Sequence, residues 1–415
     1  MHESSRIVVL HLNHQARLLE MCREAGFDLS GFTTVSLAQE DQERLEDFAK
    51  QNQKNDLHWF NHHLHLRTHP SDILPGALSV LMLGTIYRHP DMDAALGEAR
   101  VRISRYAAGK DYHLVLRKKA ARLGDAFANE YGHEIPGLQY RITTDSAPVP
   151  EKILARMAGL GWQGKNTNLI HPELGSYFFL TGIFFNAELE GYSGHSHYSG
   201  QSSPASMPGA RSEKSNIQFA NTPGEQAGSV APSNRMESGE SEVRSVAAQD
   251  SISSLSESPA TEASLFRAAN VDRCGSCRQC LDACPTGALE PYRIEASKCL
   301  SYWTIEAKSD MPPDIAKHTK GWVFGCDICQ EVCPYNKGAK GKRQITKEEA
   351  FVPRPGIMNW MKEADDPATN RIWDKLSVSS PLKRPGPERF RRSWQVATAP
   401  PLSDGNASDN PSENT

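Results

Sequence analysis

The chain has 415 residues, 38% of them hydrophobic, so it exceeds one ordinary domain and can bury a sizeable core. A formal net charge of -4 excludes a protein that binds polyanions over its whole surface, so any nucleic-acid surface must be local. The sequence contains neither a run of about eighteen apolar residues nor a basic leader with a small-residue cleavage site. We therefore expect two folded domains in a cytoplasmic protein with no membrane association.

The first predicted domain, residues 1–190, alternates amphipathic stretches with short apolar runs, as in mixed α/β or α+β domains. Buried strands are expected at Leu78–Tyr87, after the turn signal "LPG", and at Gly175–Phe185. Between them, one long helix is expected to begin near Asp111 and a second to have Pro150 in its first turn.

The remaining chain divides by composition. Residues 191–265 are rich in Ser, Gly and Pro and have no hydrophobic periodicity, so we interpret them as a low-complexity, disordered insertion. A cysteine domain follows at 266–336, then a basic segment at 337–397 and a frayed tail at 398–415. The basic segment contains 14 Lys and Arg residues but only 7 Asp and Glu.

Eight of the nine cysteines are crowded into the cysteine domain, a pattern that favours metal ligation over disulfides in a reducing compartment. The run "CGSCRQCLDACP" has the spacing C-x2-C-x2-C-x3-C-P, in which three cysteines hold one 4Fe-4S cluster and the fourth crosses to another. The later run "CDICQEVCP" has only three cysteines, with Val323 at the place of the first. Cys299 lies between the runs and can complete the second set.

The sequence therefore predicts two 4Fe-4S clusters in a bacterial-ferredoxin-like domain. The first would be bound by Cys274, Cys277, Cys280 and Cys333, and the second by Cys284, Cys299, Cys326 and Cys329. Zinc is the alternative, but this spacing is not that of a zinc ribbon. The ninth cysteine, Cys22, is interpreted as a small buried hydrophobe.

Several patterns in the first domain have competing interpretations. "GLGWQGKNT" contains G-x-G-x-x-G, but it follows a helix and precedes a strand, the reverse of a nucleotide site. His113 in "DYHLVL" is interpreted as a surface or packing residue, because Leu116 replaces the glycine of the cobalt-ligand signature D-x-H-x-x-G. A solvated face is expected for a histidine group made of His58, His62, His63, His65 and His69.

Asp145 is the strongest catalytic candidate. It follows a predicted strand, "QYRITTD", and such a position lets a side chain project into a pocket. Capping of the helix that begins near Pro150 is the alternative, and the residues alone do not decide between the two.

The chain closely resembles the epoxyqueuosine reductase family across "TTDSAPVPEKILARMAGLGWQGKNTNLIHPELGSYFFLTGIFF" and both cysteine runs. The shifted Cys299, "RISRYAAGKDYHLVLR", "LRTHPSDILPGALSV", "FVPRP" and "SPLKRPG" match the family too, so the resemblance covers most of the chain outside the insertion and the tail. It implies an α+β protein with an N-terminal mixed α/β cobalamin-binding domain, a two-cluster domain and a basic extension. The implied activity is reduction of epoxyqueuosine to queuosine in tRNA, the last step of queuosine synthesis.

The resemblance also implies roles for individual residues. Asp145 aligns with the family's proton donor, and burial would have to raise its pKa for it to act near neutral pH. Cobalamin is expected to bind without a protein histidine on cobalt. Its pocket is expected to include Arg67, Tyr106, Asp145, Lys165, Asn166 and His171. The residues expected to contact tRNA are Lys340, Lys342, Arg343, Lys383, Arg384, Arg391 and Arg392.

Two alternative functions are also compatible with these sequence patterns. A cobalamin-dependent reductive dehalogenase would use the same cofactors, but such proteins usually carry a twin-arginine export signal. A pure iron-sulfur electron-transfer protein would not bind a corrinoid. With the reductase interpretation we expect a monomer that receives electrons from a ferredoxin or flavodoxin.

Overall fold

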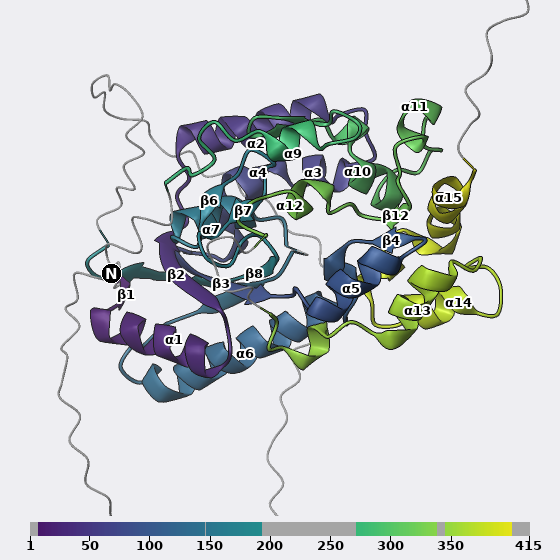
Figure 1. Ribbon diagram of the computed structural model, residues 1–415. Helices are drawn as coiled ribbons and strands as arrows, with labels where there is room; N and C mark the ends of the chain where they lie inside the picture. The colour runs from purple at the N-terminus through teal and green to yellow at the C-terminus, as the bar shows by residue number, and fades with distance from the viewer. Residues whose placement is uncertain (1–6, 146, 193–270, 338–344, 401–415) are drawn as a thin grey trace, which may run out of the picture. The chain divides into compact units, whose positions relative to one another are not determined.

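The computed structural model describes residues 7–145, 147–192, 271–337 and 345–400 (Figure 1). Its strands are β1 (Val8–Leu10), β2 (Leu29–Thr34), β3 (Ser79–Ile86), β4 (Arg102–Ile103), β5 (Tyr140–Thr143), β6 (Trp162–Gln163), β7 (Leu169–Ile170), β8 (Phe178–Phe185), β9 (Ala187–Leu189), β10 (Leu289–Glu290), β11 (Arg293–Ile294) and β12 (Trp322–Phe324). The insertion predicted at 191–265 and the tail predicted at 398–415 lie almost entirely outside the described residues.

The α-helices are α1 (Leu12–Glu24), α2 (Gln39–Gln51), α3 (His58–His62), α4 (Leu64–Thr68), α5 (Pro90–Glu98), α6 (Tyr112–Tyr131), α7 (Glu151–Met157), α9 (Gln279–Asp282), α10 (Leu300–Ile305), α11 (Pro313–Ala316), α12 (Ile328–Glu331), α13 (Pro355–Glu363), α14 (Ile372–Ser377) and α15 (Gly386–Thr398). Short 3-10 helices are η1 (Pro70–Ile73), η2 (Arg105–Ala107), η3 (Ala296–Lys298), η4 (Glu349–Phe351) and η5 (Pro381–Lys383). None of the helices in the described ranges is long and apolar enough to span a membrane.

An antiparallel sheet with the strand order β2-β3-β8-β5 organises the first part of the chain. All eight residues of β3 are buried, which explains why its sequence is a continuous apolar run and not an alternation. The strands predicted at Leu78–Tyr87 and Gly175–Phe185, and the strand before Asp145, are confirmed as β3, β8 and β5.

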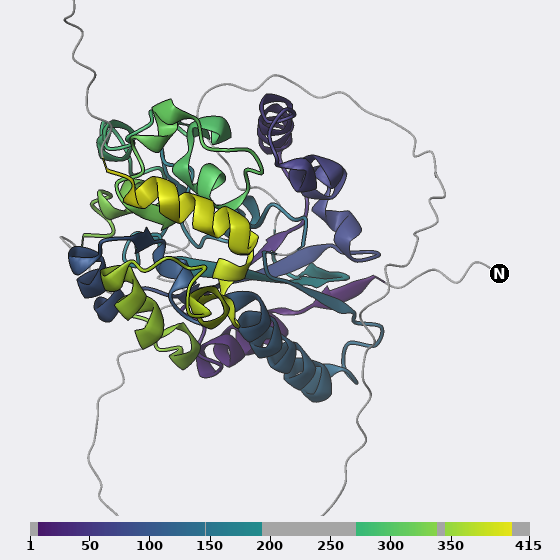
Figure 2. The same ribbon diagram turned by 90° about the vertical axis from the view of Figure 1, so that its right-hand side faces the viewer.

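Helices cover both faces of this sheet, because successive strand residues point to opposite sides. Helices α1 and α6 lie below the strands in Figure 2, where Cys22 packs in one core with Leu81 and Phe185. Helix α7 covers the other face, where Leu154 packs with Phe184. The two predicted helices are thus confirmed as α6 and α7, and the prediction that Cys22 is buried is also confirmed.

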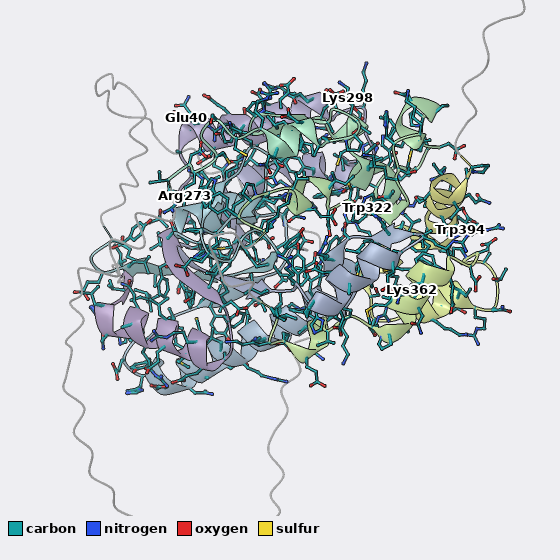
Figure 3. The ribbon with its side chains drawn as sticks, in the orientation of Figure 1. Glu40, Arg273, Lys298, Trp322, Lys362 and Trp394 are labelled. Carbon is teal, nitrogen blue, oxygen red and sulfur yellow. The ribbon has the colours of Figure 1, made fainter. Side chains whose placement is uncertain are left out.

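A second core lies around β12, which pairs in parallel with β4 of the first part of the chain. Trp322 and Phe324 of β12 are fully buried against Phe390 of α15 and Trp360 of α13. Figure 3 labels Trp322 in this core and Trp394, which packs at its edge. The described residues before and after the insertion therefore belong to one compact unit, and their mixed α and β content agrees with the prediction.

Candidate active site and metal centres

The four cysteines predicted for the first cluster, Cys274, Cys277, Cys280 and Cys333, line a cavity of about 240 Å³. Cys274 and Cys277 lie on the loop that leads into α9, a single helical turn, and Cys280 lies within that turn. Gly275 in this loop has φ +47°, a conformation that glycine adopts without steric cost, and the chain can therefore turn tightly there. Cys333 comes from the later run and packs in one apolar cluster with Cys274.

The second predicted set, Cys284, Cys299, Cys326 and Cys329, lines another cavity, of about 470 Å³. Cys299 is the N-cap residue of α10, and the intervening chain folds so that its side chain joins those of both runs. The structure therefore places a fourth thiol in the cavity where the second run lacks one. All nine cysteines are free of disulfides.

Burial, together with neighbouring thiols, raises the pKa of several cysteines in the two sets. Burial raises the pKa of Cys333 to about 11, with contributions from Cys274 and Cys280. The pKa of Cys326 rises because of burial and the proximity of Cys329 and Cys299. Thiolates are the form that binds metal, so metal binding must release these protons and would make cluster loading dependent on pH.

The lining of the larger cavity also includes Asp145, two residues beyond the end of β5. Its backbone has φ +49°, a left-handed conformation that few residues other than glycine adopt. The backbone N–H donates to Oε1 of Glu151 at 2.6 Å. The carboxylate Oδ2 accepts a hydrogen bond from the hydroxyl of Tyr112 and lies 3.3 Å from Nε2 of His113. Three partners thus hold Asp145 in a strained position.

The alternative role of Asp145 as a helix cap is wrong. Helix α7 has Pro150 as its N-cap residue and receives no side-chain cap, while Asp145 interacts with the start of α6 instead. That helix begins after Asp111, whose carboxylate accepts the backbone N–H and the ring Nδ1 hydrogen of His113.

The prediction that burial raises the pKa of Asp145 is also wrong for this structure. Burial does favour its neutral form, but the hydrogen bonds from His113 and Tyr112 outweigh that effect and lower the pKa. Burial alone would lower the pKa of His113, but the hydrogen bonds with Asp111 and Asp145 outweigh that effect and raise the pKa to about 9. Burial and the nearby charge of Asp145 raise the pKa of Glu151 to about 8. Near pH 7, a charged Asp145–His113 pair therefore lies beside a protonated Glu151.

The sequence reasoning missed three of these four groups. His113 is partly buried and bridges two carboxylates, an ion-pairing role that its interpretation as a surface or packing residue does not include. The pattern D-x-H could have indicated an ion pair at a helix start, but it was compared only with a cobalt-ligand signature. Tyr112 and Glu151 carried no signal of their own, because their role depends on the position of Asp145.

The other residues predicted for the cofactor pocket are divided between the cavities. Tyr106 and Asn166 line the larger one, and Lys165 and Asn166 line the smaller one. Lys165 donates from Nζ to the carbonyl oxygens of Gly275 and Cys277, at 2.5 and 3.0 Å. Arg67 and His171 line neither cavity, and Nδ1 of His171 accepts backbone N–H groups of its own turn.

Most of the predicted tRNA contacts that are described here have acidic partners. Arg384 pairs with Glu306 at 2.7 Å, Arg391 with Asp366 at 2.8 Å and Arg392 with Asp310 at 2.9 Å. Lys383 lies in η5. The remaining predicted contacts, Lys340, Lys342 and Arg343, lie outside the described residues.

The histidine group of α3 and α4 forms no metal site in the described part of the chain, where no three His, Cys, Asp or Glu side chains are arranged around a single ion. His65 instead pairs with Asp72 at 2.8 Å and stacks on His69. The prediction of a solvated or loop face agrees with these contacts.

The residues of the larger cavity fit a corrinoid. The corrin rim carries amide side chains, and the described lining offers Asn166, Asn168 and Gln330 as amide partners together with Ser176 and Thr167 as hydroxyl partners. No histidine is among the described lining residues of this cavity. The aromatic rings of Tyr106, Tyr112 and Phe179 supply the apolar surface that a large flat group needs.

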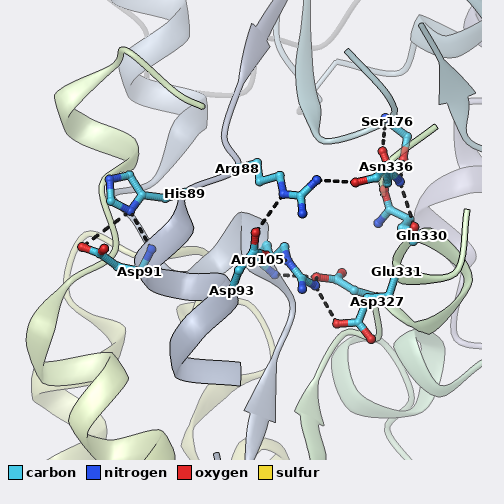
Figure 4. Close-up of polar contacts among 10 residues, drawn as sticks. All are labelled: Arg88, His89, Asp91, Asp93, Arg105, Ser176, Asp327, Gln330, Glu331 and Asn336. Carbon is cyan, nitrogen blue, oxygen red and sulfur yellow. Dashed lines mark hydrogen bonds and ion pairs between the residues drawn. The ribbon is translucent and has the colours of Figure 1, made fainter. Parts of the chain in front are cut away.

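A buried ionic network fixes the second cysteine run against the first part of the chain (Figure 4). Arg105 donates to Asp93 at 2.7 Å, to Asp327 at 3.0 Å and to Glu331 at 2.7 Å. Asp327 lies directly after Cys326, so this network positions the segment that carries three cluster cysteines. Nearby, the side chain of Asn336 joins Ser176 to the backbone of the same segment.

Comparison with known families identifies both halves of this site. Residues 67–146 match the family described as "Epoxyqueuosine reductase QueG, DUF1730", and residues 273–336 match "4Fe-4S double cluster binding domain". The fold and the two cysteine sets thus define an iron-sulfur oxidoreductase with a double-cluster domain.

The epoxyqueuosine reductase of Leadbetterella byssophila is 30% identical over 371 residues, which are 89% of this chain and 93% of the relative. That of Xanthomonas campestris is 30% identical over 391 residues, 92% of this chain and 85% of the relative. The chain belongs to the epoxyqueuosine reductase family.

Solved structures share the fold. A selenomethionine-labelled epoxyqueuosine reductase has a TM-score of 0.62 and 22% identity, with 93% of this chain and 81% of that chain covered. An epoxyqueuosine reductase with an epoxyqueuosine-modified tRNA-Tyr stem loop has a TM-score of 0.61 and 22% identity, with 93% and 80% covered. The enzyme from Bacillus subtilis, with its catalytic loop swung out of the active site, has a TM-score of 0.61 and 23% identity, with 93% and 81% covered.

Proposed function

We propose that this chain reduces epoxyqueuosine to queuosine in tRNA, with cobalamin in the larger cavity and a 4Fe-4S cluster on each cysteine set. One observation carries the proposal: four thiols and Asp145 line the same cavity. An electron carrier and a proton donor can then act on one substrate. The overall change consumes two electrons and two protons, restores the carbon-carbon double bond and releases the epoxide oxygen as water.

The cluster ligands in this proposal are the two predicted sets. Cys274, Cys277, Cys280 and Cys333 would hold the first cluster, and Cys284, Cys299, Cys326 and Cys329 the second. Two features support the division: each set lines one cavity, and the thiols that raise one another's pKa are mainly members of the same set.

Tyr106, Asn166 and Asp145 would contact cobalamin in the larger cavity, and Lys165, Arg67 and His171 remain predicted contacts. Reduced through the two clusters, bound cobalamin would supply a low-potential nucleophilic metal centre for opening the epoxide. Cys299 and Cys329 line this cavity too, so the electron path from the second cluster would be short.

Asp145 would protonate the departing oxygen. In the charged pair His113 holds a proton 3.3 Å from the Asp145 carboxylate, and Tyr112 donates to the same oxygen atom. As negative charge develops on the substrate oxygen, the proton can pass from His113 to Asp145 and onward. This relay removes the need for a raised pKa of Asp145 itself. The Bacillus subtilis relative with a displaced catalytic loop suggests that such a loop can move in this chain as well.

The substrate nucleoside would be presented by a tRNA anticodon loop, as for the relative with the modified stem loop. The predicted basic residues of 337–397 would hold its phosphates. A ferredoxin or flavodoxin donor, a monomeric state and a cytoplasmic location complete the proposal.

The decisive experiment uses the full chain, purified without oxygen, reconstituted with iron, sulfide and cobalamin, and reduced chemically. We expect it to convert epoxyqueuosine in tRNA to queuosine, measured by mass spectrometry of the digested nucleosides. Bound corrinoid with no conversion would contradict the proposed substrate. Dehalogenation of a chlorinated alkene in place of conversion would support the alternative of a reductive dehalogenase.

A further inference from the structure

Trp59 on the short helix α3 is a large aromatic side chain that the rest of the protein buries only in part. It is 44% exposed, and among the described residues no other tryptophan belongs to the exposed large hydrophobic side chains. Aromatic rings bury a large area with few rotatable bonds, so an exposed tryptophan is suited to binding a flat partner.

Two guanidinium groups flank this ring. The Cζ atom of Arg67 lies 5.1 Å from the centroid of Trp59 and that of Arg384 lies 5.5 Å from it, both within cation–π range. These contacts restrict the orientation of the ring before any ligand binds. They also place two positive charges beside it, so the group is complementary to a base that carries a phosphate.

Arg67 has no ion pair with any carboxylate of the described residues, and the charges of Glu151 and Asp145 act on it only from a longer distance. It is 9% exposed, and in the described ranges no carboxylate lies within ion-pair distance of it and its Nε has no hydrogen-bond partner. A buried cation without a counter-charge is costly, and an anionic ligand would offset that cost. Arg384 differs, because Glu306 already pairs with it.

The group lies beside the larger cavity. Phe60, next to Trp59, packs in one cluster with Tyr302 of α10 and Cys299, a lining residue of that cavity. Figure 1 shows α3 near α10, in agreement with this packing. Both arginines also act electrostatically on Asp145.

We propose that Trp59, which has Arg67 and Arg384 in cation–π range and an exposed part of its ring, stacks an unpaired nucleobase that flanks the modified nucleoside of the RNA substrate. The inference rests on the proposed function. When a nucleoside is drawn out of its stack into an active site, its neighbours lose a stacking partner. An aromatic ring beside the cavity replaces that partner, as in the recognition of single-stranded RNA loops. Arg384, whose side chain is partly exposed, then faces an adjoining phosphate, and the buried Arg67 acts on it only through its charge.

The test compares Trp59→Ala with Trp59→Phe in the reconstituted full chain. The probe is an anticodon stem-loop RNA with guanosine at the modified position, and binding is measured by fluorescence anisotropy. We expect Trp59→Ala to weaken binding by about fivefold to a hundredfold, the range for one lost base-aromatic stack, and Trp59→Phe by less than about threefold. Leu12→Ala, an exposed apolar change on α1, is the matched control and should bind like the wild type.

Two further measurements separate stacking from other roles. The slope of log affinity against log salt should stay unchanged in Trp59→Ala, whereas Arg384→Gln should reduce it by about one. Abasic substitutions in the loop should identify one position at which removal of the base and Trp59→Ala have non-additive effects. Iron and cobalamin contents should match the wild type in every variant.

Wild-type RNA affinity of Trp59→Ala with reduced cobalamin content would overturn the inference, because the ring would then serve the cofactor. Additive effects at every abasic position would overturn it too. If the wild type converts the tRNA while either result holds, only the inference fails. If the wild type neither binds nor converts the tRNA, the proposed function and the inference fail together.

Discussion

The two cysteine-lined cavities are built from closely similar sequence runs but differ in the rest of their lining. The smaller one has basic and aromatic side chains such as Lys165, Arg273 and Tyr335 beside its four cysteines. The larger one has Asp145, Glu151 and several amide and hydroxyl side chains in its lining besides its four cysteines. The cysteine spacing determines where clusters can form, whereas the other lining residues determine whether chemistry can follow. In our proposal the first cluster only passes electrons and the second delivers them to the reaction.

Cys299→Ser should have the largest effect, because it breaks one cavity and leaves the other. We expect bound iron to fall from about eight toward four atoms per chain and epoxyqueuosine reduction to be lost, since the cavity with the acid would have no intact cluster. Iron analysis and electron paramagnetic resonance of the reduced protein measure this. Cys22→Ser, which lies in neither set, should keep all its iron. Unchanged iron in Cys299→Ser would show that the assignment is wrong.

Asp145→Asn tests the proposed proton donor in the larger cavity. Asn can accept the hydrogen bond from Tyr112 but cannot transfer a proton, so single-turnover conversion with chemically reduced enzyme should fall about a hundredfold to ten-thousandfold. Iron and cobalamin contents should hold. Asp91→Asn, an exposed change on α5, is the control and should react normally. A rate within about tenfold of the wild type would make Asp145 structural, with Tyr112 and Glu151, which line the same cavity, the next residues to test.

Arg105→Gln tests whether the ionic network of Arg105 stabilises both cysteine-lined cavities. The variant leaves Asp93, Asp327 and Glu331 without their buried cation, which typically costs about 3 to 5 kcal/mol of unfolding free energy. Chemical denaturation of the anaerobic protein measures the loss. The second cysteine run, which this network fixes, contributes to both cysteine sets. Both clusters should therefore become labile, whereas Cys299→Ser should affect only one. The control Arg371→Gln removes an exposed pair with Asp374 and should cost less than about 1 kcal/mol.

His113→Gln should have the smallest effect of the four. Protonated His113 pairs with Asp145 in the folded chain, where its pKa is about 9, above the ordinary histidine value. Its contribution to stability and to proton supply is complete below about pH 6.5 and is lost as the pH rises through 9. The rate should therefore fall above about pH 9 in the wild type, and His113→Gln should lose this limb.

The same variant should react about tenfold to a hundredfold more slowly at pH 7, the range for loss of a charged hydrogen bond. His133→Gln, an exposed histidine beside Glu134, is the matched control and should preserve the profile. An unchanged alkaline limb in His113→Gln would assign that limb to Glu151, whose pKa is about 8.

Local patterns in the sequence were sufficient for the buried strands, the long helices and the grouping of cysteines. A continuous apolar run predicts a buried strand such as β3 wherever it packs, because its burial does not depend on which neighbours surround it. The position of Asp145 after β5 was also predictable, since it depends only on the end of one strand. Family resemblance then supplied a role that the residues left open.

Tertiary structure alone decided the charge state of the active site and which cysteines line the same cavity. Asp145 was expected to have a raised pKa, because burial is the effect that a sequence pattern can suggest. The hydrogen bonds that lower its pKa come from residues of α6, more than thirty positions earlier in the chain. No local sequence pattern encodes these contacts. Likewise, the spacing fixes which cysteines can share a turn. Only the packing of α10 against β12 brings Cys299 into the cavity with Cys326 and Cys329, because distant segments meet there to bury apolar surface.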